Sequence, residues 1–105
     1  MRTRGVDAEI LGEFPSGILA TTMVVYSDCV ERESVSGGRV RRVVVPLREV
    51  LGVRIEAVRG SPLVHLVIEH GTDGSGLMIE LMERPKAERA KSLLDELAAR
   101  AASRT

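Results

Sequence analysis

Short apolar runs separated by turn residues fill the first 83 positions of this 105-residue chain. Most of these runs are rich in β-branched residues and too short for helices, which favours strands. Glycine, proline, serine and aspartate lie between them, as expected where a chain turns. The pattern predicts six or seven short strands, at residues 9–14, 18–26, 29–35, 39–47, 49–58, 63–70 and 77–83.

The stretch VVVPLREVLGVRIE (43–56) interrupts a strand at a proline and then resumes it. Pro46 has no N–H to donate to a sheet, so it is typical of a strand end or of an edge. We therefore expect a tight corner here, which lets one sheet fold over another. Alternation places two sets of side chains on common faces: Val43, Val45 and Leu47 before the corner, and Val53, Ile55 and Ala57 facing inward after it.

The pattern also predicts the position of one further strand in its sheet and the buried side of another. The segment CVERESV (29–35) is polar enough to predict a strand at the edge of a sheet. In the segment LMIELME (77–83), strict alternation predicts that Leu77, Ile79 and Leu81 share one side.

After Arg84 the hydrophobic period changes from that of a strand to that of a helix. Pro85 suits the first turn of a helix, and an apolar stripe then predicts a helix at about 85–101. The stripe consists of Ala90, Leu94, Leu97 and Ala101, widened by Leu93 and Ala98. The predicted fold class is mainly β with one C-terminal helix: a bent antiparallel sheet or barrel, capped by the helix, in a single domain spanning 1–105.

The composition and the lengths of the apolar runs indicate where in the cell the protein is expected. Hydrophobic residues make up 44% and charged residues 29% of the chain, as in ordinary globular proteins. No apolar run approaches the roughly 20 residues of a membrane-spanning helix, and the N-terminus lacks the apolar core of a secretory signal. One cysteine cannot form an internal disulfide. We expect a cytoplasmic protein that does not span a membrane, with peripheral membrane contact left open.

Several segments together resemble bacterial pleckstrin-homology-like (PH-like) domains. They are EILGEF, ATTMVVYSD, VVVPLREVLGVRIE and the helix that follows MERP. Thr22 to Tyr26 resembles a strand of that family that begins with threonine and ends in tyrosine, and Val45 to Val50 resembles its proline corner. The resemblance implies seven strands in two near-orthogonal halves, capped by a helix. It does not imply phosphoinositide binding, because residues 18–35 offer Arg32 and several acids where lipid-binding members carry several basic residues.

Catalytic and metal-binding patterns are weak. Cys29 has no local catalytic signature, so an inert thiol is favoured over a nucleophile. His65 and His70 are five residues apart, which on a strand directs them to opposite faces and disfavours a shared metal. The loop GTDGSG (71–76) lacks the lysine and the following helix of a phosphate-binding loop. We therefore expect no enzyme activity, no cofactor and no metal.

The charges give one candidate site. The chain has no net charge, yet residues 37–60 hold six arginines against two glutamates. This cluster could contact phosphate groups or an acidic partner, or it could form a solvated face paired with nearby glutamates. Phe14 and Tyr26 are the only aromatic residues, which makes nucleic acid an unlikely partner. The candidate contact residues are Arg39, Arg41, Arg42, Arg54 and Arg59.

These observations predict a non-catalytic interaction domain. We expect it to bind a protein, or to associate with its own copies as a homodimer, through the edge strand CVERESV or through the groove beside the C-terminal helix. The alternative is binding of an anionic ligand, a lipid headgroup or a phosphopeptide, through the arginine cluster.

Overall fold

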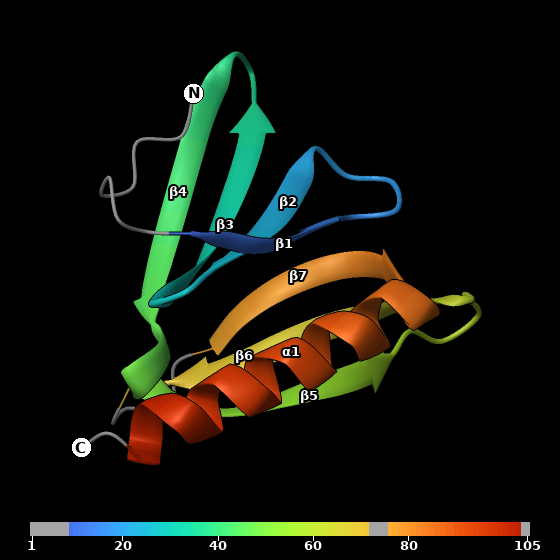
Figure 1. Ribbon diagram of the computed structural model, residues 1–105. Helices are drawn as coiled ribbons and strands as arrows, with labels where there is room; N and C mark the ends of the chain where they lie inside the picture. The colour runs from blue at the N-terminus through green and yellow to red at the C-terminus, as the bar shows by residue number, and fades with distance from the viewer. Residues whose placement is uncertain (1–8, 72–75, 104–105) are drawn as a thin grey trace.

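The computed structural model describes residues 9–71 and 76–103, which form seven strands, a 3₁₀ turn and one helix (Figure 1). The predicted fold class is therefore confirmed. The predicted and observed first residues of the strands differ most for the second strand, which begins at Thr21 instead of residue 18. The elements are β1 (Ile10–Pro15), β2 (Thr21–Tyr26), β3 (Cys29–Ser36), β4 (Arg39–Pro46), η1 (Leu47–Glu49), β5 (Val50–Ala57), β6 (Leu63–His70), β7 (Gly76–Glu83) and α1 (Arg84–Ser103).

The strands form two antiparallel sheets, a first sheet in the order β1-β2-β3-β4 and a second in the order β5-β6-β7. Within each sheet, strands that follow one another in sequence pair with each other, as short turns favour. The two sheets cross at a steep angle, and α1 lies along the second sheet (Figure 1). Among the described residues no strand of one sheet pairs with a strand of the other, so the sheets do not close into a barrel.

The corner predicted at Pro46 connects the two sheets. Pro46 ends β4, and η1 turns the chain through a corner before β5 begins at Val50 in the second sheet (Figure 1). Leu47 anchors the corner, because its side chain is buried and its backbone N–H donates to the carbonyl of Asp28, 3.0 Å away.

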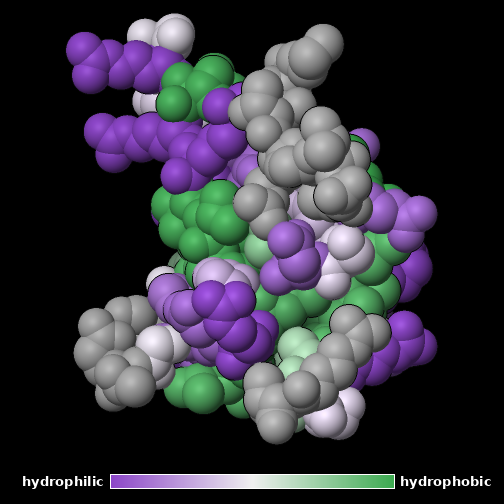
Figure 2. Space-filling view, turned by 60° about the vertical axis from the view of Figure 1, so that its left-hand side comes forward, coloured by the Kyte–Doolittle hydropathy of each residue, from purple (hydrophilic) through white to green (hydrophobic). Residues whose placement is uncertain are grey.

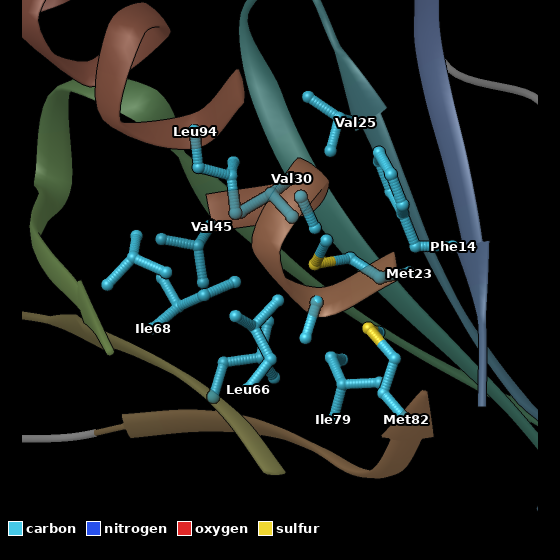
Figure 3. Packing of buried hydrophobic residues seen from close by; sticks show 14 of the residues in the cluster. Phe14, Met23, Val25, Val30, Val45, Leu66, Ile68, Ile79, Met82 and Leu94 are labelled. Carbon is cyan, nitrogen blue, oxygen red and sulfur yellow. The ribbon is translucent and has the colours of Figure 1, made fainter. Parts of the chain in front are cut away.

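Side chains from both sheets and from α1 meet in one core (Figure 3). Met23 and Val25 of the first sheet, Leu66 and Ile68 of the second, and Leu94 of α1 all belong to this core. Complete burial of a leucine stabilises a fold by about 1.5–3 kcal/mol. We call the side of the first sheet that meets this core its inner face, and the opposite side its outer face.

The predicted helical stripe is confirmed. Ala90 and Leu94 are fully buried, Leu97 is nearly so, and Leu93 and Ala101 pack against the core.

The prediction that residues 29–35 form an edge strand is wrong. They belong to β3, which lies between β2 and β4. Its three charged residues have partners within the fold, since Arg42 of β4 pairs with Glu31 and Glu33, and Arg32 donates to a carbonyl of the second sheet. The edges of the first sheet are β1 and β4.

The prediction for Leu81 is also wrong. A register shift in the β6–β7 ladder lies between the pairs Val64↔Met82 and Leu66↔Ile79, and Leu81 has a positive φ of 56°. This bulge changes the alternation, so that Met82 is fully buried in the core and Leu81 is half-buried.

Val43 and Ala57 keep their predicted faces but are exposed. Val43 is on the inner face at a position where it lines an open cavity beside β7. Ala57 is the last residue of β5, at the margin of the second sheet.

Candidate binding surface at the edge of the first sheet

Among the described residues no strand pairs with β4 on the side away from β3, and this open edge is the most distinctive surface of the fold. A two-residue turn, Gly37-Gly38, connects β3 to β4, and both glycines have the positive φ angles, 57° and 77°, of a type I′ hairpin. In such a turn the flanking residues Ser36 and Arg39 are a hydrogen-bonded pair. Hydrogen-bonded and non-hydrogen-bonded pairs then alternate along the ladder. Val40, Arg42 and Val44 therefore direct their backbone N–H and C=O groups toward the open edge.

The same strand exposes apolar side chains. Val40 is 50% and Val44 is 44% exposed, both on the outer face, and Val35 of β3 lies directly opposite Val40. Figure 2, which brings the β4 side forward, shows hydrophobic surface next to projecting hydrophilic side chains. This edge therefore combines open backbone groups with apolar contact area.

The structure divides the five predicted arginines instead of gathering them. Arg39 and Arg41 lie on the inner face of the first sheet, whereas Arg42 lies on the outer face. Arg54 lies on β5 in the second sheet, and Arg59 is in the exposed turn that follows β5.

Two of these arginines are already neutralised. The Arg42 Nε lies 3.1 Å from Glu33 Oε2 and 3.5 Å from Oε1 of Glu31, a carboxylate that is only 3% exposed. Arg54 pairs with Glu56 at 2.8 Å and with Glu69 at 3.1 Å. The hydrogen bond that Arg54 donates to the Glu56 carboxylate raises the pKa of Arg54 above its ordinary value. By contrast, Arg39 and Arg41 make no ion pair with any residue that the structure describes, which leaves their charges available.

Arg32 was missing from the predicted set. It lies on β3 opposite Val43, on the same inner face as Arg41, and its Nη1 donates to the carbonyl of Met78 at 3.1 Å. The sequence contained a signal for this placement, because a two-residue Gly-Gly turn fixes the β3–β4 register and therefore the shared face.

Two cavities adjoin this inner face. The first, about 350 Å³, lies between the first sheet and β7, and the second, about 470 Å³, lies toward the β3–β4 turn. Both are lined by Arg41 and Ser34. The first is completed by Leu19, Thr21, Arg32, Val43, Met78 and Glu80, and the second by Ser36, Gly37 and Arg39.

A groove also lies beside the helix, where the sequence predicted one. It has a volume of about 450 Å³ and brings Leu11, Leu47 and Leu97 together with Arg48 and Arg100. Glu9 and Asp28 line the same groove, so its charges are mixed.

The structure also places the residues that were considered for catalysis or metal binding. Cys29 is 2% exposed and packs with Val24 and Tyr26 in a small buried cluster. His65 accepts a hydrogen bond from the N–H of Leu81 through Nδ1, at 3.2 Å, and His70 lies on the opposite face of β6. Residues 72–75 of the glycine-rich loop lie outside the described residues.

Neither a metal site nor a membrane helix is found in the described part of the chain. Within residues 9–71 and 76–103, no three His, Cys, Asp or Glu side chains gather closely enough to hold a metal ion. The one helix in these ranges, α1, is not apolar enough to cross a membrane.

Comparison with known proteins finds no relative of this chain. No model of a protein family matches the chain, and neither a curated protein nor a solved structure is significantly similar to it.

Proposed function

We propose that this chain is a non-catalytic interaction domain that binds an extended protein segment along the free edge of β4. The segment would add a fifth strand to the first sheet, with main-chain hydrogen bonds supplying affinity and side-chain contacts supplying selectivity.

The regularity of β4 is the observation that carries this proposal. The two sheets have four edge strands, β1, β4, β5 and β7, and three of them contain a register shift in their pairing. Bulges of this kind are a common protection against unwanted strand addition. β4 pairs with β3 over eight consecutive residues without a shift, from Arg39 to Pro46. It is thus the edge best suited to receive another strand.

The PH-like resemblance remains part of the proposal. It is supported by the element order, in which four strands form one sheet, three strands form a second, and a helix follows. A fold analogy alone is weak support for a function, so the binding role rests on the edge.

The alternative of anion binding through the whole arginine cluster has less support. Arg42 and Arg54 are paired with glutamates of their own sheets, and Arg54 and Arg59 lie on other elements than Arg39 and Arg41. Two of the five predicted residues, Arg39 and Arg41, therefore remain together on one face.

Strand addition can be tested with peptides selected from a random library displayed on phage. Val44→Pro removes an N–H that points to the open edge and places a proline ring there, while the bonds of β4 to β3 stay intact. We expect this variant to lose at least tenfold in affinity for the selected peptides. The matched control Val44→Thr keeps the N–H and the β-branched shape, and we expect it to bind within about threefold of the original protein.

Amide hydrogen exchange locates the contact. Bound peptide should slow exchange at Val40, Arg42 and Val44, whose N–H groups point to the edge. Peptides that bind Val44→Pro as tightly as the original protein, or that protect amides near Leu97 instead, would show that β4 is not the binding edge.

A further inference from the structure

We infer that the segment received by β4 alternates acidic and apolar side chains, with its acidic side chains on the inner face beside Arg39 and Arg41. This inference rests on the proposed strand addition and specifies the chemistry of the partner.

The inner face supplies unused positive charge. Arg39 and Arg41 are two residues apart on β4, so they point to the same side and would flank the side chains of an added strand. Neither makes an ion pair within the described residues, and the cavities that they line leave room for partner side chains. Arg32 adds a further positive charge in the first cavity, where Glu80 is the one acidic residue of the lining. Acidic side chains directly opposite Arg39 and Arg41 would form cross-strand ion pairs.

The outer face calls for apolar side chains. Val40 and Val44 are exposed there, and Arg42, which lies between them, is occupied by Glu31 and Glu33. A partner residue opposite either valine gains by burying apolar surface. Since successive residues of a strand alternate between faces, the two preferences together define an alternating acidic and apolar segment.

A second copy of this chain fits the edge less well. The sequence of β4 is RVRRVVVP, which contains three arginines and no acid. Antiparallel pairing of two such strands would bring the unpaired Arg39 and Arg41 of both copies, four arginines in all, to one short ladder, where like charges oppose association. The charge on the edge therefore favours a different, acidic segment over self-association.

The test uses three synthetic peptides of equal length that alternate valine with glutamate, with serine or with lysine. Fluorescence polarisation should show binding in the order glutamate, serine, lysine, and affinity for the glutamate peptide should fall as salt rises. In the double variant Arg39→Gln with Arg41→Gln, we expect the glutamate peptide to bind about threefold to tenfold more weakly, near the level of the serine peptide. Arg54→Gln is the matched control, because Arg54 is equally a strand arginine but lies on the second sheet; we expect it to leave binding unchanged.

The outcomes separate the two proposals. If the three peptides bind equally and the double variant changes nothing, strand addition stands and the acidic preference is overturned. If no peptide binds and the amides of Val40, Arg42 and Val44 exchange as before, strand addition itself fails. If sedimentation shows a dimer that Val44→Pro dissociates, the occupant is a second copy, and the inference of an acidic partner is wrong.

Discussion

Leu81 has a backbone conformation that leucine rarely adopts. Its φ of 56° lies in the left-handed region, which costs a non-glycine residue about 1–2 kcal/mol. Nearby groups hold it there: its N–H donates to His65 Nδ1, and its carbonyl accepts from the Gly17 N–H at 2.8 Å and from Ser16 Oγ at 3.2 Å. The bulge thus ties the β1–β2 loop to β7 and links the two sheets.

This strain leads to an unusual order of mutant stabilities. Leu81→Gly removes the whole side chain but relieves the strain, so we expect the free energy of unfolding to stay within about 1 kcal/mol of the original. Leu81→Val removes fewer atoms but puts a β-branched side chain at a positive φ, and we expect a loss of about 1–2 kcal/mol. Urea unfolding measures both, and a larger loss for the glycine variant would contradict the role of strain.

At the level of elements, the sequence predicted the strands and the helix because their hydrophobic periods are unambiguous. It also predicted the corner at Pro46, because a proline without an N–H has few places in a sheet. It failed for β3, since a polar strand in the middle of a sheet looks like an edge strand until its cross-strand partners are known. The bulge at Leu81 was hidden for a similar reason, because it depends on His65 and Ser16, which are distant in sequence.

The candidate surface was predictable only in part. Arg39 and Arg41 were identified, but local charge could not separate them from Arg42 and Arg54. That separation depends on glutamates across the sheet, which the register of the strands brings into contact.

The β3–β4 pair gives a test of this separation. Arg42→Ala would leave the buried carboxylate of Glu31 without its ion pair, and we expect a loss of about 1–2 kcal/mol, moderated because Arg42 is itself partly exposed. Arg41→Ala, on the same strand, removes an arginine that forms no ion pair with the described part of the chain, and we expect a change below about 0.5 kcal/mol. Thermal unfolding of the two variants compares them directly. Equal losses would mean that the Arg42 pairs do not support the strand.

At the scale of the whole molecule, α1 joins the two sheets into one core. Leu94 is fully buried within the cluster that includes Met23 of the first sheet and Ile68 of the second. Because α1 contacts β1 of the first sheet and β5, β6 and β7 of the second, the folding of each sheet is coupled to the docking of the helix. We therefore expect the described elements to unfold together.

Leu94→Ala tests this coupling. The cavity that it leaves should lower the free energy of unfolding by about 2–5 kcal/mol, whereas Glu88→Ala on the exposed side of α1 should change it by less than about 0.5 kcal/mol. Tyr26 is the only tyrosine and the chain has no tryptophan, so tyrosine fluorescence reports on the first sheet and circular dichroism reports on the helix. We expect both signals to shift by the same amount in Leu94→Ala. Two separate transitions would show that the sheets are held together by other contacts.

The unbroken pairing of β4 has a further consequence for the protein when it is alone. An uninterrupted strand margin is a template on which other chains can stack, and a molecule with no net charge has no long-range repulsion to keep its copies apart. The local charges of Arg39 and Arg41 then provide the main repulsion between two copies of this margin. Raising the salt concentration screens these charges, so precipitation of the protein alone should increase with salt and begin at this margin. A bound segment that covers this margin would therefore increase the solubility of the protein.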